Sequence, residues 1–437
     1  ESGGRQMKSR YVKVALSLCL AACAAGLCIS LSSSHKEEAV AAPARIQLRL
    51  NESLTNEISD TSALAGMDKR IENYMRQWAL RGTSLAIMRN DSLVYAKGYG
   101  WADKELDINM EPSHILRVAS VSKLLTATGI MMLQERGLVS LRDTVFGPRG
   151  ILTDSVYASV IKDPNYKKIT VEDLLRHKGG FTSAGGDPMF STRYIIQQNH
   201  LETPPDHITL MQTQLKRRLR FVPGTSQHYS NFGYLLLSMI IEKVSGLDYE
   251  TYMRDSVLVP AGCVDMHIAN NYYEEKFPNE VRYYNGADSD LVEEYNNSGK
   301  LVDRCYGGND VHSLAGAGAW VTSVPELARF VASIDGRDEV PDIISKESVA
   351  AMTEWFDENT YSLGWNDTKP TGEWTRTGTM SGTSALVKYY PDGECWIMVT
   401  NTSTWKGPGF TRYTAGLFRD LRARYSAQLP RRDLFYK

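Results

Sequence analysis

Apolar residues at helical spacing mark two segments, one near each end of the chain. The first predicts an amphipathic helix of about three turns, and its apolar positions are Met67, Ile71, Tyr74, Met75 and Trp78. The second predicts a closing helix and is marked by Leu417, Phe418 and Leu421. Each end of the chain therefore contributes a helix.

Two pairs of short apolar segments follow the pattern of β-hairpins. In the first pair, residues 83–88 and 92–97 flank the polar sequence Arg89-Asn90-Asp91. In the second pair, residues 385–390 and 395–400 flank Pro391-Asp392-Gly393. Such segments around a short turn predict hairpins. Because the middle of the chain is largely helical in pattern, we expect one sheet built from both ends, with a helical region inserted between them.

The composition is that of an ordinary globular protein. The 437 residues are 42% hydrophobic and 23% charged, and the formal net charge is −2. These fractions exclude a disordered or collagen-like chain, and the near-neutral charge argues against a nucleic-acid-binding protein. We expect an N-terminal signal or membrane segment at 1–35, a linker at 36–63, the main domain at 64–425 and a C-terminal tail at 426–437.

The N-terminal segment has the pattern of an export signal. Lys8, Arg10 and Lys13 precede residues 14–31, an uncharged and mostly apolar run. This run is intermediate in length between a signal peptide and a membrane-spanning helix of ~20 residues. The sequence Leu-Ala-Ala-Cys at 20–23 also resembles a bacterial lipobox. We therefore expect a protein of the cell envelope, on the periplasmic side, that is membrane-anchored or a lipoprotein; the choice between the two anchors stays open.

The cysteines give no disulfide framework. Three of the six lie in the N-terminal apolar run, which leaves Cys263, Cys305 and Cys395 for the main domain. These three are widely spaced, and no CxxC pair indicates a zinc site. Free buried thiols are the favoured interpretation, with one disulfide as the alternative. We expect no metal and no cofactor.

The first element that carries chemistry is Ser120-Val121-Ser122-Lys123. It opens a run that is apolar on nearly every side, which predicts a buried helix. Ser120 and Lys123 are three residues apart and so share one helical face. Burial lowers the pKa of a lysine, which allows it to accept the proton of a neighbouring hydroxyl. The same S-x-x-K spacing occurs at 33–36 and 403–406, but neither example opens a buried helix.

Two further elements offer partners for that serine. In Tyr229-Ser230-Asn231 the alternation of an extended segment directs Tyr229 and Asn231 to the same side. Tyr229 can act as a general base and acid, and Asn231 can bind a substrate carbonyl. In the strand-like Arg376-Thr377-Gly378-Thr379, glycine permits close approach of a ligand. Arg376 can bind a carboxylate, and the Thr379 N–H can join that of Ser120 in an oxyanion hole.

In this order, the three elements resemble the S-x-x-K, Y-x-N and K-T-G motifs of the serine β-lactamase/penicillin-binding-protein superfamily. Because the second motif is Tyr-Ser-Asn, the resemblance is to the class C β-lactamase and DD-peptidase branch. The resemblance covers about residues 64–425. The flanking segments that also resemble this branch are 84–103, 169–180, 221–247, 316–330 and 361–365.

The resemblance implies an α+β fold: an α/β sandwich with an antiparallel sheet, an inserted helical subdomain and a cleft between them. By position it implies that Ser120 is the acylated nucleophile and that Lys123 and Tyr229 transfer its proton. It further implies that Asn231 binds the substrate amide and that the Thr379 N–H completes the oxyanion hole.

The third motif departs from the family at its first position. Arg376 stands where the family usually has Lys or His, ahead of Thr377 and Gly378. Arginine stays protonated but can bind a carboxylate through two hydrogen bonds. An anionic substrate is therefore expected, and efficient β-lactam hydrolysis is less favoured.

We expect an exported serine hydrolase that acts through an acyl-enzyme on peptide or amide substrates, such as peptidoglycan stem peptides. The alternatives are a broad-specificity esterase, a class C-type β-lactamase and, from another class, a non-catalytic penicillin-binding or sensor protein. The expected partners are the substrate and, through the N-terminal segment, a membrane, but no nucleic acid. His177 and His228 flank two motifs and are interpreted as structural. The tyrosines that either rim the cleft or pack a long loop are Tyr272, Tyr273, Tyr283 and Tyr284.

Overall fold

In the computed structural model, which describes residues 46–184, 186–286 and 290–436, both predicted hairpins lie in one antiparallel sheet. The central strands β1 and β12 come from opposite ends of the chain and pair from Thr83↔Thr400 to Arg89↔Glu394. This arrangement confirms the expected sheet. In spatial order its strands are β3 (Ile108–Asn109), β2 (Ser92–Asp103), β1 (Gly82–Arg89), β12 (Glu394–Thr400), β11 (Thr383–Tyr389), β10 (Trp374–Met380) and β9 (Asp367–Thr368).

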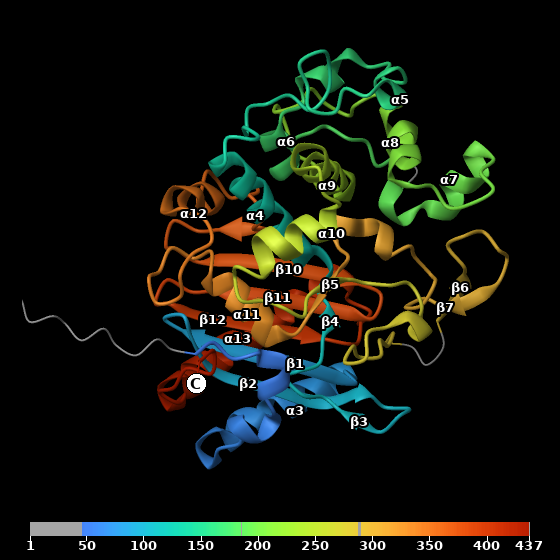
Figure 1. Ribbon diagram of the computed structural model, residues 1–437. Helices are drawn as coiled ribbons and strands as arrows, with labels where there is room; N and C mark the ends of the chain where they lie inside the picture. The colour runs from blue at the N-terminus through green and yellow to red at the C-terminus, as the bar shows by residue number, and fades with distance from the viewer. Residues whose placement is uncertain (1–45, 185, 287–289, 437) are drawn as a thin grey trace, which may run out of the picture. The chain divides into compact units, whose positions relative to one another are not determined.

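Alternation along the strands divides the apolar side chains between two layers. In β1, Leu85 and Ile87 belong to the cluster that includes helices α3 (Ala65–Trp78) and α13 (Thr411–Tyr425). Ala86 and Met88 belong to the larger cluster on the other face, which includes α11 (Val324–Ala332). Because successive side chains of a strand point to opposite faces, both faces of the sheet are covered. The predicted terminal helices are confirmed as α3 and α13 (Figure 1).

The turn of the first hairpin explains its register. Asn90 and Asp91 both have positive φ angles, of 48° and 58°. Two consecutive left-handed residues are the geometry of a type I′ turn, whose twist matches that of the flanking strands. Asp91 is nevertheless buried, with 2% of its surface exposed.

The inserted region is mostly helical, as expected, and contacts the sheet beside β10. Its long central helices α4 and α9 pack against each other, and the turn that precedes α4 contacts β10. In Figure 1 most of the short helices of this region lie around α9, away from the strands. The helices of this region are α4 (Ser122–Glu135), α5 (Ser155–Ala158), α6 (Val171–Leu175), α7 (Thr192–Asn199), α8 (His207–Leu215), α9 (Asn231–Ser245) and α10 (Tyr249–Tyr252).

Smaller elements connect the inserted region with the sheet. A three-stranded sheet has the order β4-β8-β5, and β6 pairs with β7. A π-helix (Met253–Leu258) continues α10. The remaining elements are α2 (Leu50–Ser53), β4 (Leu116–Arg117), β5 (His267–Ile268), β6 (Leu291–Glu293), β7 (Leu301–Asp303), β8 (Trp320–Thr322) and α12 (Lys346–Thr353).

The expected linker and tail are wrong where the structure describes them. Residues 46–63 are not a tether, because Leu50 and Leu54 are buried and the Asn56 side chain binds the backbone of β2. The segment 426–436 is not a free tail either, since Phe435 is fully buried. The two segments pair, with the Leu48 N–H donating to the Phe435 carbonyl at 2.9 Å. Their few apolar residues find partners only in tertiary contact with each other and with the sheet.

The expected export segment lies outside the described residues, as does Cys23. Within the described ranges, no helix is long and apolar enough to cross a membrane. The three cysteines of the main domain are free and buried, which confirms the favoured interpretation.

Candidate active site

Ser120 lies in a tight turn that leads directly into α4. The turn spans Ala119–Val121, and Ser120 itself is half-buried, whereas every residue from Ser122 to Leu133 is buried. Ala119 adopts a φ of 48°, a left-handed conformation that is strained for a residue with a Cβ atom. The strained turn thus presents the Ser120 hydroxyl at the end of an otherwise inaccessible helix.

Lys123 lies one turn further along and is completely buried. Its Nζ atom donates to Ser120 Oγ at 3.2 Å, to Asn231 Oδ1 at 2.6 Å and to the Ala317 carbonyl at 2.5 Å. It also lies 4.9 Å from the centre of the Tyr229 ring. The first two motifs therefore meet at one ammonium group.

The environment makes both proton-transfer candidates titrate near neutral pH. Burial lowers the pKa of Lys123 to about 8; the nearby charge of Tyr229 opposes this, and that of Arg376 adds to it. For Tyr229, burial raises the pKa, but the charges of Lys123 and Arg376 outweigh it and bring the pKa down to about 8. The Tyr229 hydroxyl also accepts an N–H of Arg376 at 3.2 Å. A hydroxyl proton from Ser120 therefore has two acceptors of suitable pKa within one hydrogen-bond network.

The N-terminus of α9 positions the second motif. The Ser230 side chain accepts the Gly233 N–H at 3.1 Å and caps the helix, so that α9 starts at Asn231. Asn231 donates from Nδ2 to Asp187 Oδ2 at 2.6 Å. Since its Oδ1 accepts from Lys123, the amide is held in one orientation between the ammonium and a carboxylate. Asp187 was not predicted from the sequence.

His177 supports Tyr229 from behind. The two rings stack with centroids 4.3 Å apart, and His177 Nδ1 accepts the Ser230 N–H at 3.1 Å. Burial, with the charges of Lys123 and Arg376, holds the pKa of His177 well below its usual value. The histidine therefore stays neutral and acts as a rigid aromatic wall, in agreement with its structural interpretation.

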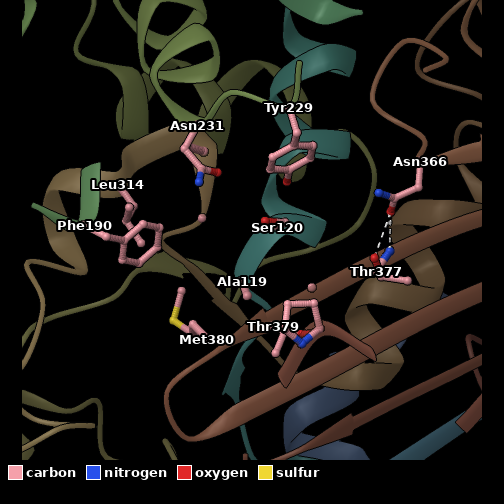
Figure 2. Close-up of a pocket in the computed structure, with 14 residues that line it drawn as sticks. Ala119, Ser120, Phe190, Tyr229, Asn231, Leu314, Asn366, Thr377, Thr379 and Met380 are labelled. Atoms are coloured by element: carbon pink, nitrogen blue, oxygen red, sulfur yellow. Dashed lines mark hydrogen bonds between the residues drawn. The ribbon is translucent and has the colours of Figure 1, made fainter. Parts of the chain in front are cut away.

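The third motif lies on β10, which passes close to the turn of Ser120. A Cβ atom at Gly378 would lie 2.2 Å from the Val118 carbonyl oxygen and 3.0 Å from the Ser120 nitrogen. Only glycine permits this approach, which brings Thr379 beside Ser120. Thr377 is fixed by Asn366, whose Oδ1 accepts both the Thr377 N–H at 2.6 Å and its hydroxyl at 3.1 Å (Figure 2).

Arg376 does not occupy the place expected for a ligand of a substrate carboxylate. Its side chain is 1% exposed and does not line the cavity. Its Nε donates to the Ser120 carbonyl at 2.8 Å, Nη1 to the Gly364 carbonyl at 3.1 Å, and Nη2 to the Tyr229 hydroxyl at 3.2 Å. The alternation of the strand turns it away from Thr377 and Thr379. Arg376 thus holds the nucleophile turn and the tyrosine in place.

Ser120, Tyr229, Asn231 and the Thr377–Thr379 strand line one cavity of about 340 Å³. Figure 2 shows Ser120 at its centre, with Tyr229 and Asn231 above and Thr379 below. The sequence did not predict the apolar side, formed by Phe190, Leu314, Met380 and Pro408, which come from the end of β10 and from three separate short helical turns. None of the residues that line the cavity carries a formal charge. The four tyrosines of the 272–284 stretch lie outside this lining.

Among the described residues, no group of three or more His, Cys, Asp or Glu side chains could hold a metal ion. A half-exposed hydroxyl, a buried amine and a phenol of matched pKa, and two backbone N–H groups beside them are the parts needed for acyl transfer to serine.

Comparison with known proteins decides the family. A family model described as Beta-lactamase matches residues 67–419. The chain belongs to the β-lactamase family. This confirms the resemblance to the serine β-lactamase/penicillin-binding-protein superfamily and the expected fold, and it places the protein among the serine hydrolases of that family.

Individual proteins show a likeness to this chain over most of its length. The chain is 28% identical to a Bacillus subtilis (strain 168) protein provisionally named penicillin-binding protein PbpX, over 76% of this chain and 73% of that protein. The structure of D-amino acid amidase from Ochrobactrum anthropi SV3 with D-phenylalanine matches with a TM-score of 0.63 and 19% identity, over 83% of this chain and 99% of that one. D-alanine carboxypeptidase AmpC from Burkholderia cenocepacia matches with a TM-score of 0.61 and 19% identity, over 82% and 99%.

Proposed function

We propose that this β-lactamase family member cleaves amide or peptide bonds that follow a small or D-configured residue, through an acyl-enzyme on Ser120. The observation that carries the proposal is the contact of 3.2 Å between Ser120 Oγ and the fully buried Lys123 Nζ. With a pKa of about 8, Lys123 can exist as a neutral amine at physiological pH.

In the proposed reaction, the Ser120 hydroxyl gives its proton to the Lys123–Tyr229 pair while Oγ bonds to the substrate carbonyl carbon. The carbonyl oxygen becomes an oxyanion that faces the N–H groups of Ser120 and Thr379. When the intermediate collapses, the bond to the leaving nitrogen breaks and Tyr229 gives that nitrogen a proton. A water molecule then attacks the serine ester through the same groups and releases the acid.

The uncharged lining favours substrates whose leaving group is neutral. Arg376 lies behind the cavity and is occupied by three protein acceptors, so the Thr377 hydroxyl and Asn366 are the polar groups left for the leaving side. A buried carboxylate without a cationic partner is costly. We therefore expect D-aminoacyl amides and esters to react at least as well as peptides that end in a free carboxylate.

The names of the matched proteins support this choice of substrate. They describe one penicillin-binding protein, one amidase of D-amino acids and one carboxypeptidase of D-alanine. All three names fit a carbonyl group attached to a D-centre. A broad esterase activity is a second candidate, because the uncharged cavity accepts an alcohol leaving group as well as an amine.

The decisive experiment is intact-protein mass spectrometry of the full chain after incubation with a fluorescent penicillin, next to Ser120→Ala. We expect an adduct of one acyl group on the wild-type protein and none on the variant. A lasting adduct identifies a penicillin-binding peptidase, whereas rapid loss of penicillin without an adduct identifies a β-lactamase.

A parallel assay compares a peptide ending in D-alanyl-D-alanine with the same peptide as a C-terminal amide, and with a p-nitrophenyl ester. If no acyl donor, including a fluorophosphonate, modifies or is cleaved by the wild-type chain, the proposed reaction is wrong. If only the free-acid peptide is cleaved, the proposed preference for a neutral leaving group is wrong.

We also propose that the protein acts in the cell envelope. The support is the basic and then apolar sequence at 8–31, together with a substrate class that occurs in peptidoglycan. Fractionation of cells that express the full chain, with and without residues 8–31, tests this location. Recovery of both forms in the cytosol would contradict it.

A further inference from the structure

A second hollow adjoins the catalytic cavity at the end of β10. It has a volume of about 680 Å³, and it shares Thr379, Met380 and Pro408 with the catalytic cavity. Its far wall includes Trp78 and Trp405. We call this hollow the Trp405 groove. The shared residues make it a continuation of the catalytic cavity and not a separate site.

Trp405 is placed for contact with a ligand. Among the described residues it has the largest exposed fraction of any large hydrophobic side chain, 79%. Its backbone is nevertheless fixed on both sides, because the Ser403 N–H donates to the Tyr284 carbonyl and the Gly407 N–H to the Thr404 carbonyl, both at 3.0 Å. The exposed indole ring is therefore held at the wall of the groove by a fixed loop backbone.

Neighbouring rings extend the indole into a platform. Trp78 lies with its ring centroid 6.5 Å from that of Trp405, and Tyr413 lies 4.6 Å from Trp78. Lys406 Nζ lies 4.0 Å from the centre of the Trp405 ring. An aromatic surface with a stacked cation on one side suits an apolar or aromatic side chain of a ligand.

The geometry of the catalytic groups says which part of a substrate reaches the groove. The leaving group must lie next to Tyr229, which gives it a proton, and Tyr229 is held by Arg376. Met380 lies four residues after Arg376 on β10, which at the rise of a strand is about 13 Å further along. Figure 2 shows Met380 and Tyr229 on opposite sides of Ser120. The groove therefore begins on the acyl side of the scissile bond.

We propose that the Trp405 groove binds the residues that precede the scissile bond of a peptide substrate, with an apolar or aromatic side chain against Trp405. The inference extends the function proposed above and rests on it for the direction of the chain. Binding energy from this remote contact can be used at the reacting carbonyl, so elongated substrates react faster than short ones.

The test uses two substrates with the same leaving group, acetyl-D-alanine p-nitroanilide and acetyl-Phe-Gly-D-alanine p-nitroanilide. For the wild-type chain we expect kcat/KM to be about tenfold higher with the long substrate, the size of one aromatic contact. In Trp405→Ala this ratio falls to about one, while kcat/KM for the short substrate stays within about twofold. The matched control is Trp355→Ala, since Trp355 is 41% exposed and lies outside the groove.

Binding to Ser120→Ala separates this inference from the proposed reaction. That variant cannot be acylated, so fluorescence titration with the same two p-nitroanilides measures binding without reaction. The difference between their affinities then reports the groove alone. We expect the long one to bind at least about fivefold more tightly, and the difference to vanish in Ser120→Ala with Trp405→Ala. Equal binding, or a change in oligomeric state of Trp405→Ala with an unchanged ratio, would overturn the proposal whatever the activity.

Discussion

Two buried pairs of side chains, one basic and one acidic, lie in different parts of the protein and have different surroundings. Lys123 and Arg376 are 0% and 1% exposed and lie directly behind the catalytic cavity. Asp91, in the turn of the first hairpin, and Asp335, which interacts with it, are 2% and 7% exposed. Burial disfavours the charged form in both places, which lowers the pKa of Lys123 and raises that of Asp91.

The Asp91–Asp335 pair retains a proton that has only a structural role. Burial, then a hydrogen bond to Asp335 and the charge of that group, raises the pKa of Asp91 to about 9. Asp335 in turn accepts the Tyr389 hydroxyl at 2.7 Å and the Arg337 N–H at 3.0 Å. Neither aspartate lines the catalytic cavity or the Trp405 groove.

The comparison teaches that a shifted pKa does not identify an active site. The shift of Asp91 is larger than that of Lys123, yet only Lys123 has a hydroxyl at 3.2 Å and a cavity in front of it. A perturbed group becomes a candidate for catalysis when a reacting atom can reach it. The predictions below therefore separate effects on turnover from effects on stability.

The largest effect is expected from Lys123→Met. The substitution keeps an unbranched side chain only one atom shorter but removes the nitrogen that receives the Ser120 proton, so kcat/KM should fall about 10³-fold, within the usual range for a general base. The measurement is the rate of p-nitroaniline release, with the rate of penicillin adduct formation beside it. Thermal unfolding is the control, because a folded but inactive variant separates chemistry from stability. A variant that keeps more than about a tenth of the activity would show that Tyr229 suffices as base.

Arg376→Gln should have a smaller effect with a characteristic dependence on pH. The positive charge of Arg376 lowers the pKa of both Lys123 and Tyr229. Without it both pKa values rise, so the acidic limb of the kcat/KM profile moves to higher pH and activity at pH 7 drops about 10- to 100-fold. The profile of Arg376→Lys, which keeps the charge, should stay close to that of the wild type.

Asp187→Asn is a control in which the acidic limb of the pH profile should move in the opposite direction. The negative charge of Asp187 raises the pKa of Lys123, so its removal should move the acidic limb to lower pH. Asparagine can still accept the hydrogen bond from Asn231. If both variants move the limb in the same direction, or neither moves it, the charges around Lys123 do not set its titration.

The sequence contained the information for the sheet and the nucleophile because both depend on local patterns. Short apolar segments on either side of a polar turn defined the hairpins of β1–β2 and β11–β12, and the apolar helix after Ser120 distinguished this S-x-x-K from the one at 403–406. The alternation of side chains along a strand separates Arg376 from Thr377, so the inward direction of the arginine could have been predicted from the strand itself. The family resemblance instead favoured a substrate contact.

Other features depend on tertiary contacts that no local pattern reveals. Asp187 meets Asn231 across 44 residues of sequence, and its loop has no distinctive motif. Residues 46–63 have few apolar positions, and these pack only because the segment at 426–436 lies beside them. The Trp405 groove likewise combines the end of α3 with a loop after β12. Such sites are determined by the assembled fold.

The smallest effect on turnover, and the sharpest test of the comparison, is expected from Asp91→Asn. Asparagine still donates to Asp335 and suits the left-handed turn conformation, but it carries no charge at any pH. The folded pKa of Asp91, about 9, is above its unfolded value of 3.8. Folding of the wild type therefore takes up a proton between these values, and its stability decreases as the pH rises towards 9.

Arg337 and Glu339 also face Asp91 and remain in the variant, so their contribution cancels in the comparison. The melting temperature of Asp91→Asn should exceed that of the wild type by an amount that grows from pH 5 to pH 9, and kcat/KM at pH 8 should stay within about twofold. A constant difference in melting temperature would assign the gain to the turn alone, since backbone preference does not titrate. A loss of turnover with the fold intact would show that the acidic pair is coupled to the catalytic cavity, and the two clusters would then no longer be independent.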